Sequence, residues 1–208
     1  MAEIIYSHAF TTLARVKERL SIDKTGFDAL LTRLINVATD LIESGCNRKF
    51  KTQTYTNELY SVYHDNEEFL LLKQMPVTAL TKLEYRLGLP NNPTWQVFPP
   101  ESFELSEDGA SGLVRLYFSP IKGTNAIRAT YTAGYKISFA DFGDLTKHNL
   151  PADISDLCER LVSRIFKRRE AEGKTQETFD GGTVNWQTDL SAEDKDILNG
   201  YKKLPVFI

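Results

Sequence analysis

Acidic residues are the side chains of this sequence that come nearest to a catalytic pattern. They occur in three small groups: Glu67 and Glu68; Glu101, Glu104, Glu107 and Asp108; and Asp141 and Asp144. Two neighbouring carboxylates can hold a divalent cation or hydrolyse a glycosidic bond. All three groups lie beside expected turns, where Asp and Glu are common because they are solvated. We therefore expect no catalytic pair, and a carboxylate-based hydrolase stays an alternative.

Histidine and cysteine give no stronger signal. His8, His64 and His148 are isolated, and none has a second ligand-type residue at i+4 on an expected helix, so we expect exposed polar side chains. Cys46 and Cys158 fall on the apolar stripes of expected helices, which favours buried, reduced thiols. We predict no catalytic residue, no metal site and no cofactor, and hence not an enzyme.

One short segment resembles the end of a phosphate-binding loop, namely Gly173-Lys174-Thr175. That motif needs an earlier glycine where Arg168 stands, and it needs a strand before the loop where a helix is expected here. We therefore expect no nucleotide site.

A basic cluster marks the end of an expected helix and consists of Arg164, Lys167, Arg168 and Arg169. Cations in a last helical turn complement the helix dipole. The same side chains could contact a nucleic-acid backbone or an acidic partner surface. Nearby glutamates dilute the cluster, so the sequence leaves both interpretations open.

The C-terminal residues form an apolar tail beyond the last expected helix: Leu204, Pro205, Val206, Phe207 and Ile208. They could fold back onto the helices. Alternatively, the tail is a docking peptide for a partner, with the proline stiffening an extended conformation.

The expected elements are helices at the two ends of the chain and strands between them. Apolar residues at three- and four-residue spacing predict long helices over Phe27–Cys46 and Pro151–Arg169, and shorter helices follow the capping residues Thr12 and Ser191. From Arg48 the apolar period changes to two, which predicts short antiparallel strands. These strands are Thr52–Val62, Glu68–Lys73, Ala79–Arg86, Trp95–Phe98, Phe103–Leu105, Leu113–Phe118 and Ala126–Thr132.

The predicted fold class is therefore α+β: a helical bundle of three to four helices with a large antiparallel β-rich insertion. Residues 1–50 and 150–208 would form a discontinuous helical core, and residues 51–149 the insertion domain. A chain of 208 residues fits one core with a sizeable insertion.

Composition restricts the function classes. The net charge of −3 argues against a protein that coats nucleic acid, and the apolar content of 41% suffices for a core. We see neither a signal peptide nor the run of about 20 apolar residues that spans a bilayer. The expectation is a soluble protein made in the cytoplasm, without membrane contact.

Several segments, taken in order, resemble the head–tail connector (adaptor, or head-completion) proteins of tailed bacteriophages and prophages. They are Leu30–Glu43, Cys46–Phe50, Leu72–Leu80, Leu83–Tyr85, Ile127–Tyr135, Leu150–Val162 and Lys167–Glu170. Each segment alone is a helix face or a turn, and only the ordered set is specific. The family has no catalytic residues to transfer.

The resemblance implies a structural virion protein of the neck, made in the bacterial host cytoplasm. Such adaptors form a ring, typically of twelve copies, beneath the portal protein and prolong the DNA channel without reading its sequence. They offer a docking surface to a stopper or tail-completion protein, and in related proteins the C-terminal segment reaches toward the portal. The alternative function is a DNA-binding accessory protein of genome packaging.

Overall fold

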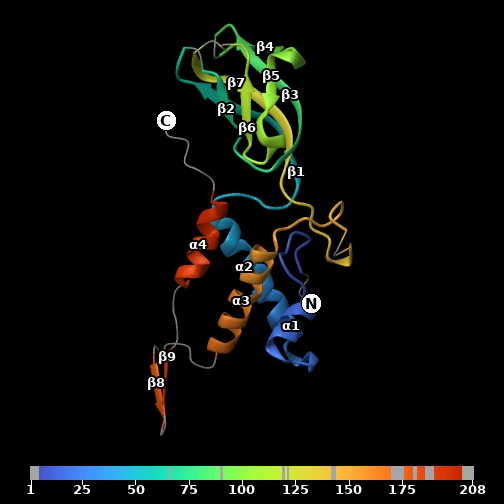
Figure 1. The fold of residues 1–208 in the computed structure, drawn as a ribbon, viewed down its shortest axis with the longest axis vertical. Helices are drawn as coiled ribbons and strands as arrows, with labels where there is room; N and C mark the ends of the chain where they lie inside the picture. Colours follow the sequence, from blue (N-terminus) through green and yellow to red (C-terminus); the bar gives the residue numbers. More distant parts are fainter. Residues whose placement is uncertain are drawn as a thin grey trace. The chain divides into compact units, whose positions relative to one another are not determined.

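The computed structural model describes residues 5–202, except 66, 90, 119, 121, 142–143, 170–175, 180–181 and 186–189. Contacts divide the chain into two compact units. Met1–Arg48 and Lys136–Lys202 form a helical unit, and Lys49–Tyr135 form a β-rich unit (Figure 1).

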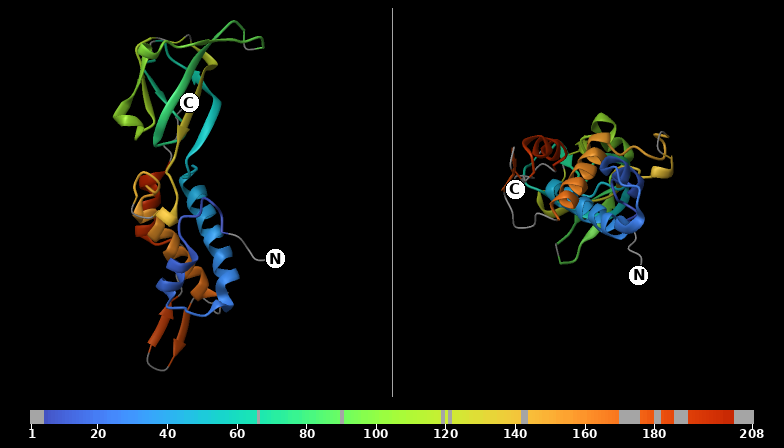
Figure 2. Two further views of the ribbon diagram at one scale, coloured as in Figure 1. Left: turned by 90° about the vertical axis from the view of Figure 1, so that its right-hand side faces the viewer. Right: turned by 90° about the horizontal axis from the view of Figure 1, so that it is seen from below.

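In the described part of the helical unit there are four α-helices: α1 (Leu13–Leu20), α2 (Asp28–Cys46), α3 (Ala152–Arg168) and α4 (Ala192–Tyr201). Both α1 and α4 contact α2 and α3, and α2 and α3 run side by side (Figure 2). Thr12 caps α1 by accepting a hydrogen bond from the Arg15 amide, and Ser191 begins α4 in a capping box with Asp194. Both helix starts match the predicted capping residues.

The core of the helical unit lies where α2 and α3 face each other. Leu31, Ile35, Ala38 and Ile42 of α2 are buried, as are Ile154, Leu157, Cys158 and Val162 of α3. Two residues of the apolar stripe predicted over Phe27–Cys46 are exposed rather than buried: Phe27, which precedes α2, and Leu41 within it. The apolar surface of α2 is therefore wider than its buried face.

The β-rich unit contains two antiparallel sheets. One has the order β1-β7-β3-β4, from β1 (Gln53–Val62), β7 (Gly123–Ala133), β3 (Val77–Leu87) and β4 (Thr94–Val97). The other has the order β2-β6-β5, from β2 (Phe69–Leu71), β6 (Leu113–Leu116) and β5 (Phe103–Leu105). The inward residues of β7 alternate, with Ile127, Ala129, Tyr131 and Ala133 buried in the core of this unit.

Gly134 ends β7 where another side chain would not fit. Its φ is +111°, and a Cβ atom would lie 2.7 Å from the Phe50 carbonyl oxygen. The Tyr135 amide donates to that same oxygen at 2.6 Å. The glycine thus lets two backbone segments approach closely.

The remaining elements are short. They are the 3₁₀ turns η1 (Thr25–Phe27), η2 (Pro100–Ser102), η3 (Ser106–Gly109) and η4 (Phe139–Asp141), and the hairpin β8 (Gln176–Phe179) with β9 (Gly182–Asn185). Among the described residues, no helix has both the length and the apolar character needed to cross a membrane.

The predicted α+β class is confirmed: helices from both ends of the chain, with antiparallel strands between them. Residues 136–149 group with the helices rather than with the strands. Hydrogen bonds close this loop, with the Lys136 amide donating to Asn149 Oδ1 at 2.6 Å and the Asn149 amide donating to the Lys136 carbonyl at 3.0 Å. A discontinuous helical core of residues 1–50 and 150–208 with an insertion of residues 51–149 stays a proposal; the contacts divide the chain near Arg48 and Lys136 instead.

Candidate functional site

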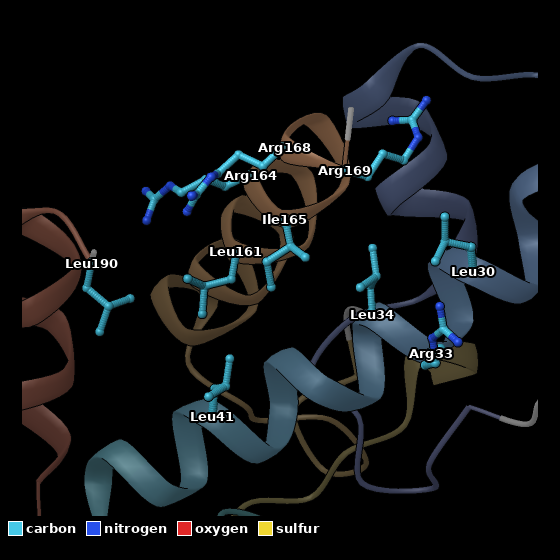
Figure 3. A pocket seen from close by; sticks show the side chains of 10 residues that line it. All are labelled: Leu30, Arg33, Leu34, Leu41, Leu161, Arg164, Ile165, Arg168, Arg169 and Leu190. Atoms are coloured by element: carbon cyan, nitrogen blue, oxygen red, sulfur yellow. The ribbon is translucent and has the colours of Figure 1, made fainter. Parts of the chain in front are cut away.

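A groove between α2 and α3 is the main candidate site, with a volume of about 530 Å³ (Figure 3). Its apolar lining comes from Leu30, Leu34 and Leu41 of α2, from Leu161 and Ile165 of α3, and from Leu190. Four arginines line it as well: Arg33, Arg164, Arg168 and Arg169. Such an apolar surface suits a segment that carries apolar side chains.

The groove exists because α2 carries more apolar residues than its core face needs. Leu41 is 52% exposed although it belongs to the predicted stripe. Ile35 and Ala38 are fully buried, whereas Leu41 lies at the edge of the buried face and lines the groove. In the sequence, the only indication of this groove is that the predicted apolar stripe of α2 contains more residues than the buried face does.

Arg164 of the predicted basic cluster is engaged within the protein. Its guanidinium lies 2.8 Å from Oδ2 of Asp194, a carboxylate with no exposed surface. Burial by itself raises the pKa of Asp194, but the hydrogen bonds from Arg164 and Ser191 outweigh burial and hold the pKa below its usual value. Arg164 therefore joins α3 to the start of α4.

Arg169 is also held in place. Its guanidinium lies over the ring of Phe166 at 3.8 Å and near that of Phe27 at 5.1 Å, and it donates to the Phe166 carbonyl oxygen at 2.7 Å. The arginine thereby satisfies a carbonyl in the last turn of α3. Lys167 is exposed, and Arg168 lines the groove.

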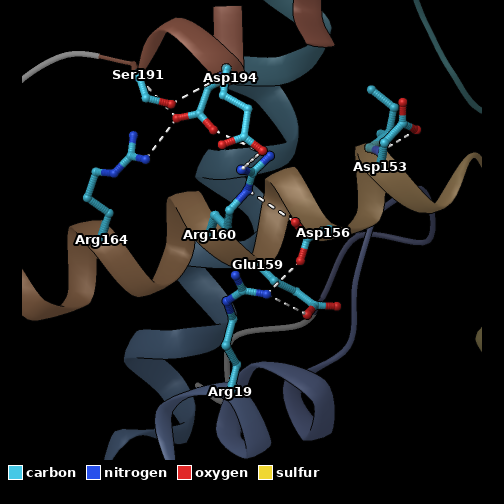
Figure 4. A network of polar contacts seen from close by, with 10 residues as sticks. Arg19, Asp153, Asp156, Glu159, Arg160, Arg164, Ser191 and Asp194 are labelled. Carbon is cyan, nitrogen blue, oxygen red and sulfur yellow. Dashed lines mark hydrogen bonds and ion pairs between the residues drawn. The ribbon is translucent and has the colours of Figure 1, made fainter.

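A wider network of ion pairs extends along α3 (Figure 4). Asp156 accepts from Arg19 of α1 at 2.6 Å and lies 3.1 Å from Arg160, and Arg160 lies 3.0 Å from Glu193 of α4. Thus α3 is tied to the first and the last helix. Of the basic cluster at the end of α3, Arg164 and Arg169 therefore contact other residues of the helical unit.

The predicted interface residues Leu204, Pro205, Val206, Phe207 and Ile208 lie outside the described residues. Their role, like that of the basic cluster, stays a proposal.

The acidic groups lie in or beside turns and loops, as expected, except that Glu104 belongs to the short strand β5. Asp141 and Asp144 lie on either side of Lys147, at 3.0 and 3.8 Å. Hydrogen bonds from Ser138 and then Lys147 lower the pKa of Asp141. Asp144 accepts from the Thr146 amide at 2.9 Å. These carboxylates stabilise a loop.

Both cysteines are buried free thiols, as predicted. Burial raises the pKa of Cys46 to about 11 and that of Cys158 to about 12. Neither thiol is therefore a thiolate near neutral pH, which removes the reactive form of the side chain.

Sequence reasoning missed a polar cluster in the core of the β-rich unit. The hydroxyls of Tyr60 and Tyr131 both donate to Oε2 of Glu58, the second at 2.6 Å. Burial raises the pKa of both tyrosines. Because the raised pKa values keep both hydroxyls protonated at neutral pH, the cluster suits a structural role rather than proton transfer.

The expectation of isolated, exposed histidines was wrong for His148 and His8. His148 is buried and its Nδ1 accepts from the Ser138 amide at 3.1 Å; burial lowers its pKa. His8 lies beside Asp40 and Glu43. Residue spacing within one helix does not reveal the group of His8, Asp40 and Glu43, because His8 precedes the helix that carries both carboxylates.

Two solved structures share this fold. One is a chain from the neck of an empty gene transfer agent particle, at 15% identity and a TM-score of 0.52. The other is a chain from the virion of a native gene transfer agent particle, at 16% identity and a TM-score of 0.56. Each match covers 94% of this chain and 90% of the other.

A comparison with curated proteins gave no match. The sequence model of the head completion protein family, in contrast, matches residues 9–204, which include both helical segments and all the strands. The chain therefore belongs to the head completion protein family.

Proposed function

We propose that this protein is a structural head–tail connector at the neck of a phage-like particle. The family match over residues 9–204 carries the proposal. A fold shared with a chain from the neck of a gene transfer agent particle supports it. In this role the protein binds the portal as a ring, extends the DNA channel and offers a docking surface to a stopper or tail protein.

The chemistry of the described residues supports a protein that works through its surfaces. Two buried carboxylates pair with arginines within the fold, Asp194 with Arg164 and Glu84 with Arg128. The acidic turn residues Asp141 and Asp144 form ion pairs with Lys147. We therefore propose a non-enzymatic role in which the α2–α3 groove receives a segment of a neighbouring protein.

Solution mass with and without the cognate portal protein tests this function. Light scattering should show a multi-copy complex, twelve copies on the portal ring, when the two proteins are mixed. Deleting Val206–Ile208 should weaken that complex while the circular dichroism spectrum and the melting temperature stay unchanged. The proposal would be contradicted if the chain did not bind the portal protein, whether the portal is monomeric or assembled into a ring.

The alternative, a DNA-binding accessory protein, predicts affinity that falls steeply with salt as phosphate contacts release counterions. Arg164 faces Asp194 and Arg169 faces two rings, so few cations of the basic cluster are directed to a duplex. We expect duplex binding by the free chain to be weak at 150 mM salt. Tight binding that Lys167→Ala and Arg168→Ala abolish would favour the alternative.

A further inference from the structure

The residues ahead of α1 lie along α2 in a fixed conformation. The Tyr6 amide donates to Asn36 Oδ1 at 2.9 Å, and the Phe10 amide donates to Thr39 Oγ1 at 3.4 Å. Between these contacts the Ala9 amide donates to the Tyr6 carbonyl oxygen at 3.0 Å, which forms a turn. The turn holds His8 against the next part of α2.

Three potential metal ligands meet at this turn: His8, Asp40 and Glu43. One ligand atom from each lies within 4.8 Å of the other two. Asp40 and Glu43 are three residues apart on α2, so both carboxylates point to the same side of the helix. The ring of His8 is stacked on Tyr6, with centroids 4.9 Å apart and planes at 15°, which fixes the direction of the imidazole.

We propose that His8, Asp40 and Glu43 bind a zinc-type divalent cation. An imidazole nitrogen and two carboxylate oxygens would supply three ligands, and water the fourth. One nitrogen ligand favours Zn²⁺ over Mg²⁺ and Ca²⁺, which prefer oxygen donors alone.

The geometry needs only a small adjustment to close around the ion. Ligand atoms of a tetrahedral zinc site lie roughly 3.4 Å apart, as follows from bond lengths of about 2.1 Å. Glu43 is only 4% exposed, and the turn holds His8, whereas Asp40 is exposed and can change rotamer. Asp40 can therefore move while the other two ligands stay in place.

A divalent ion bound here would join the N-terminal segment to α2, through His8 on one side and the two carboxylates on the other. The inference stands independently of the proposed role at the neck.

Isothermal titration of the full chain, stripped with a chelator and dialysed, tests the site directly. ZnCl₂ should bind with one ion per chain, and MgCl₂ at the same concentration should bind at least tenfold more weakly. Excess Zn²⁺ should also raise the melting temperature of the chain, since an ion that binds only the folded state stabilises it. The absence of saturable Zn²⁺ binding would overturn the proposal.

Three variants assign the binding to these residues. His8→Gln and Asp40→Asn should each weaken Zn²⁺ binding at least tenfold while the metal-free melting temperature stays close to that of the parent. His64→Gln is the matched control, because it removes an exposed histidine from the β-rich unit. Equal binding by His8→Gln and the parent would overturn the assignment. Nuclear magnetic resonance shifts of the His8 ring nitrogens on Zn²⁺ addition give a second readout that does not depend on stability.

Discussion

Asp194 is a carboxylate without exposed surface that performs two tasks at the start of α4. Its Oδ2 accepts from the Ser191 amide at 3.1 Å, which completes the capping box, and from Arg164 at 2.8 Å. Removing one partner of such a pair leaves the other charge partly buried and uncompensated. The attachment of α4 to α3 therefore depends strongly on this single side chain.

We expect Asp194→Asn to lower the free energy of unfolding by about 3 kcal/mol at pH 7, measured by urea denaturation. Because the folded-state pKa of Asp194 lies below its usual 3.8, its carboxylate stabilises the fold above that pH. The difference between variant and parent should shrink as the pH falls below 3.8 and through the folded pKa. Glu193→Gln is the control: Glu193 pairs with Arg160 but its side chain is 74% exposed, so the loss should stay below about 1 kcal/mol. Equal losses for the two variants would contradict this account.

On the scale of elements, one arginine connects three strands of the larger sheet. Arg128 of β7 lies opposite Glu84 of β3 and donates to both of its carboxylate oxygens, at 2.6 and 2.8 Å. Its guanidinium also lies 4.5 Å from the ring of Trp95 on β4. Hydrogen bonds from Arg128 lower the pKa of the buried Glu84.

Arg128→Lys should lower the free energy of unfolding of the β-rich unit by about 2 kcal/mol. Lysine keeps the charge but loses the two-pronged hydrogen bond and the planar stacking on Trp95. Thermal denaturation followed by near-ultraviolet circular dichroism, which reports tryptophan packing, measures the effect. Lys82→Gln is the comparison, because Lys82 also contacts Glu84 at 2.8 Å but its side chain is 43% exposed. A larger loss for Lys82→Gln would contradict the predicted ranking.

Elements governed by local periodicity could be predicted from the sequence, and contacts between distant residues could not. The change of apolar period at Arg48 placed the boundary between helices and strands, and Thr12 and Ser191 placed two helix starts. The exposure of Leu41 depends on how α2 is rotated against α3, which its own pattern does not fix. The meeting of His8 with Asp40 depends on a turn held by hydrogen bonds to α2.

On the scale of the whole molecule, the candidate site also has a part that the sequence could predict and a part that it could not. The sequence predicted the basic end of α3 from its local charge. It did not predict that Arg164 would be engaged by Asp194, because these residues belong to different helices. The apolar part of the groove comes likewise from α2, from α3 and from Leu190. The groove is therefore assembled from separate segments of the chain, and no single segment reveals it.

The groove can be tested without disturbing the fold, because α2 offers a matched pair of exposed apolar residues. Leu41 is 52% exposed and lines the groove, whereas Val37 is 42% exposed and is not among the lining residues. Leu41→Asp introduces a charge where a partner's apolar side chain would be desolvated, so we expect at least a tenfold loss of assembly with the cognate portal or stopper protein. Val37→Asp should assemble like the parent, and both variants should keep its melting temperature within a few degrees, since surface substitutions usually change stability little. Light scattering of the mixtures measures assembly. If Val37→Asp abolished assembly and Leu41→Asp did not, the docking surface would lie on another side of α2.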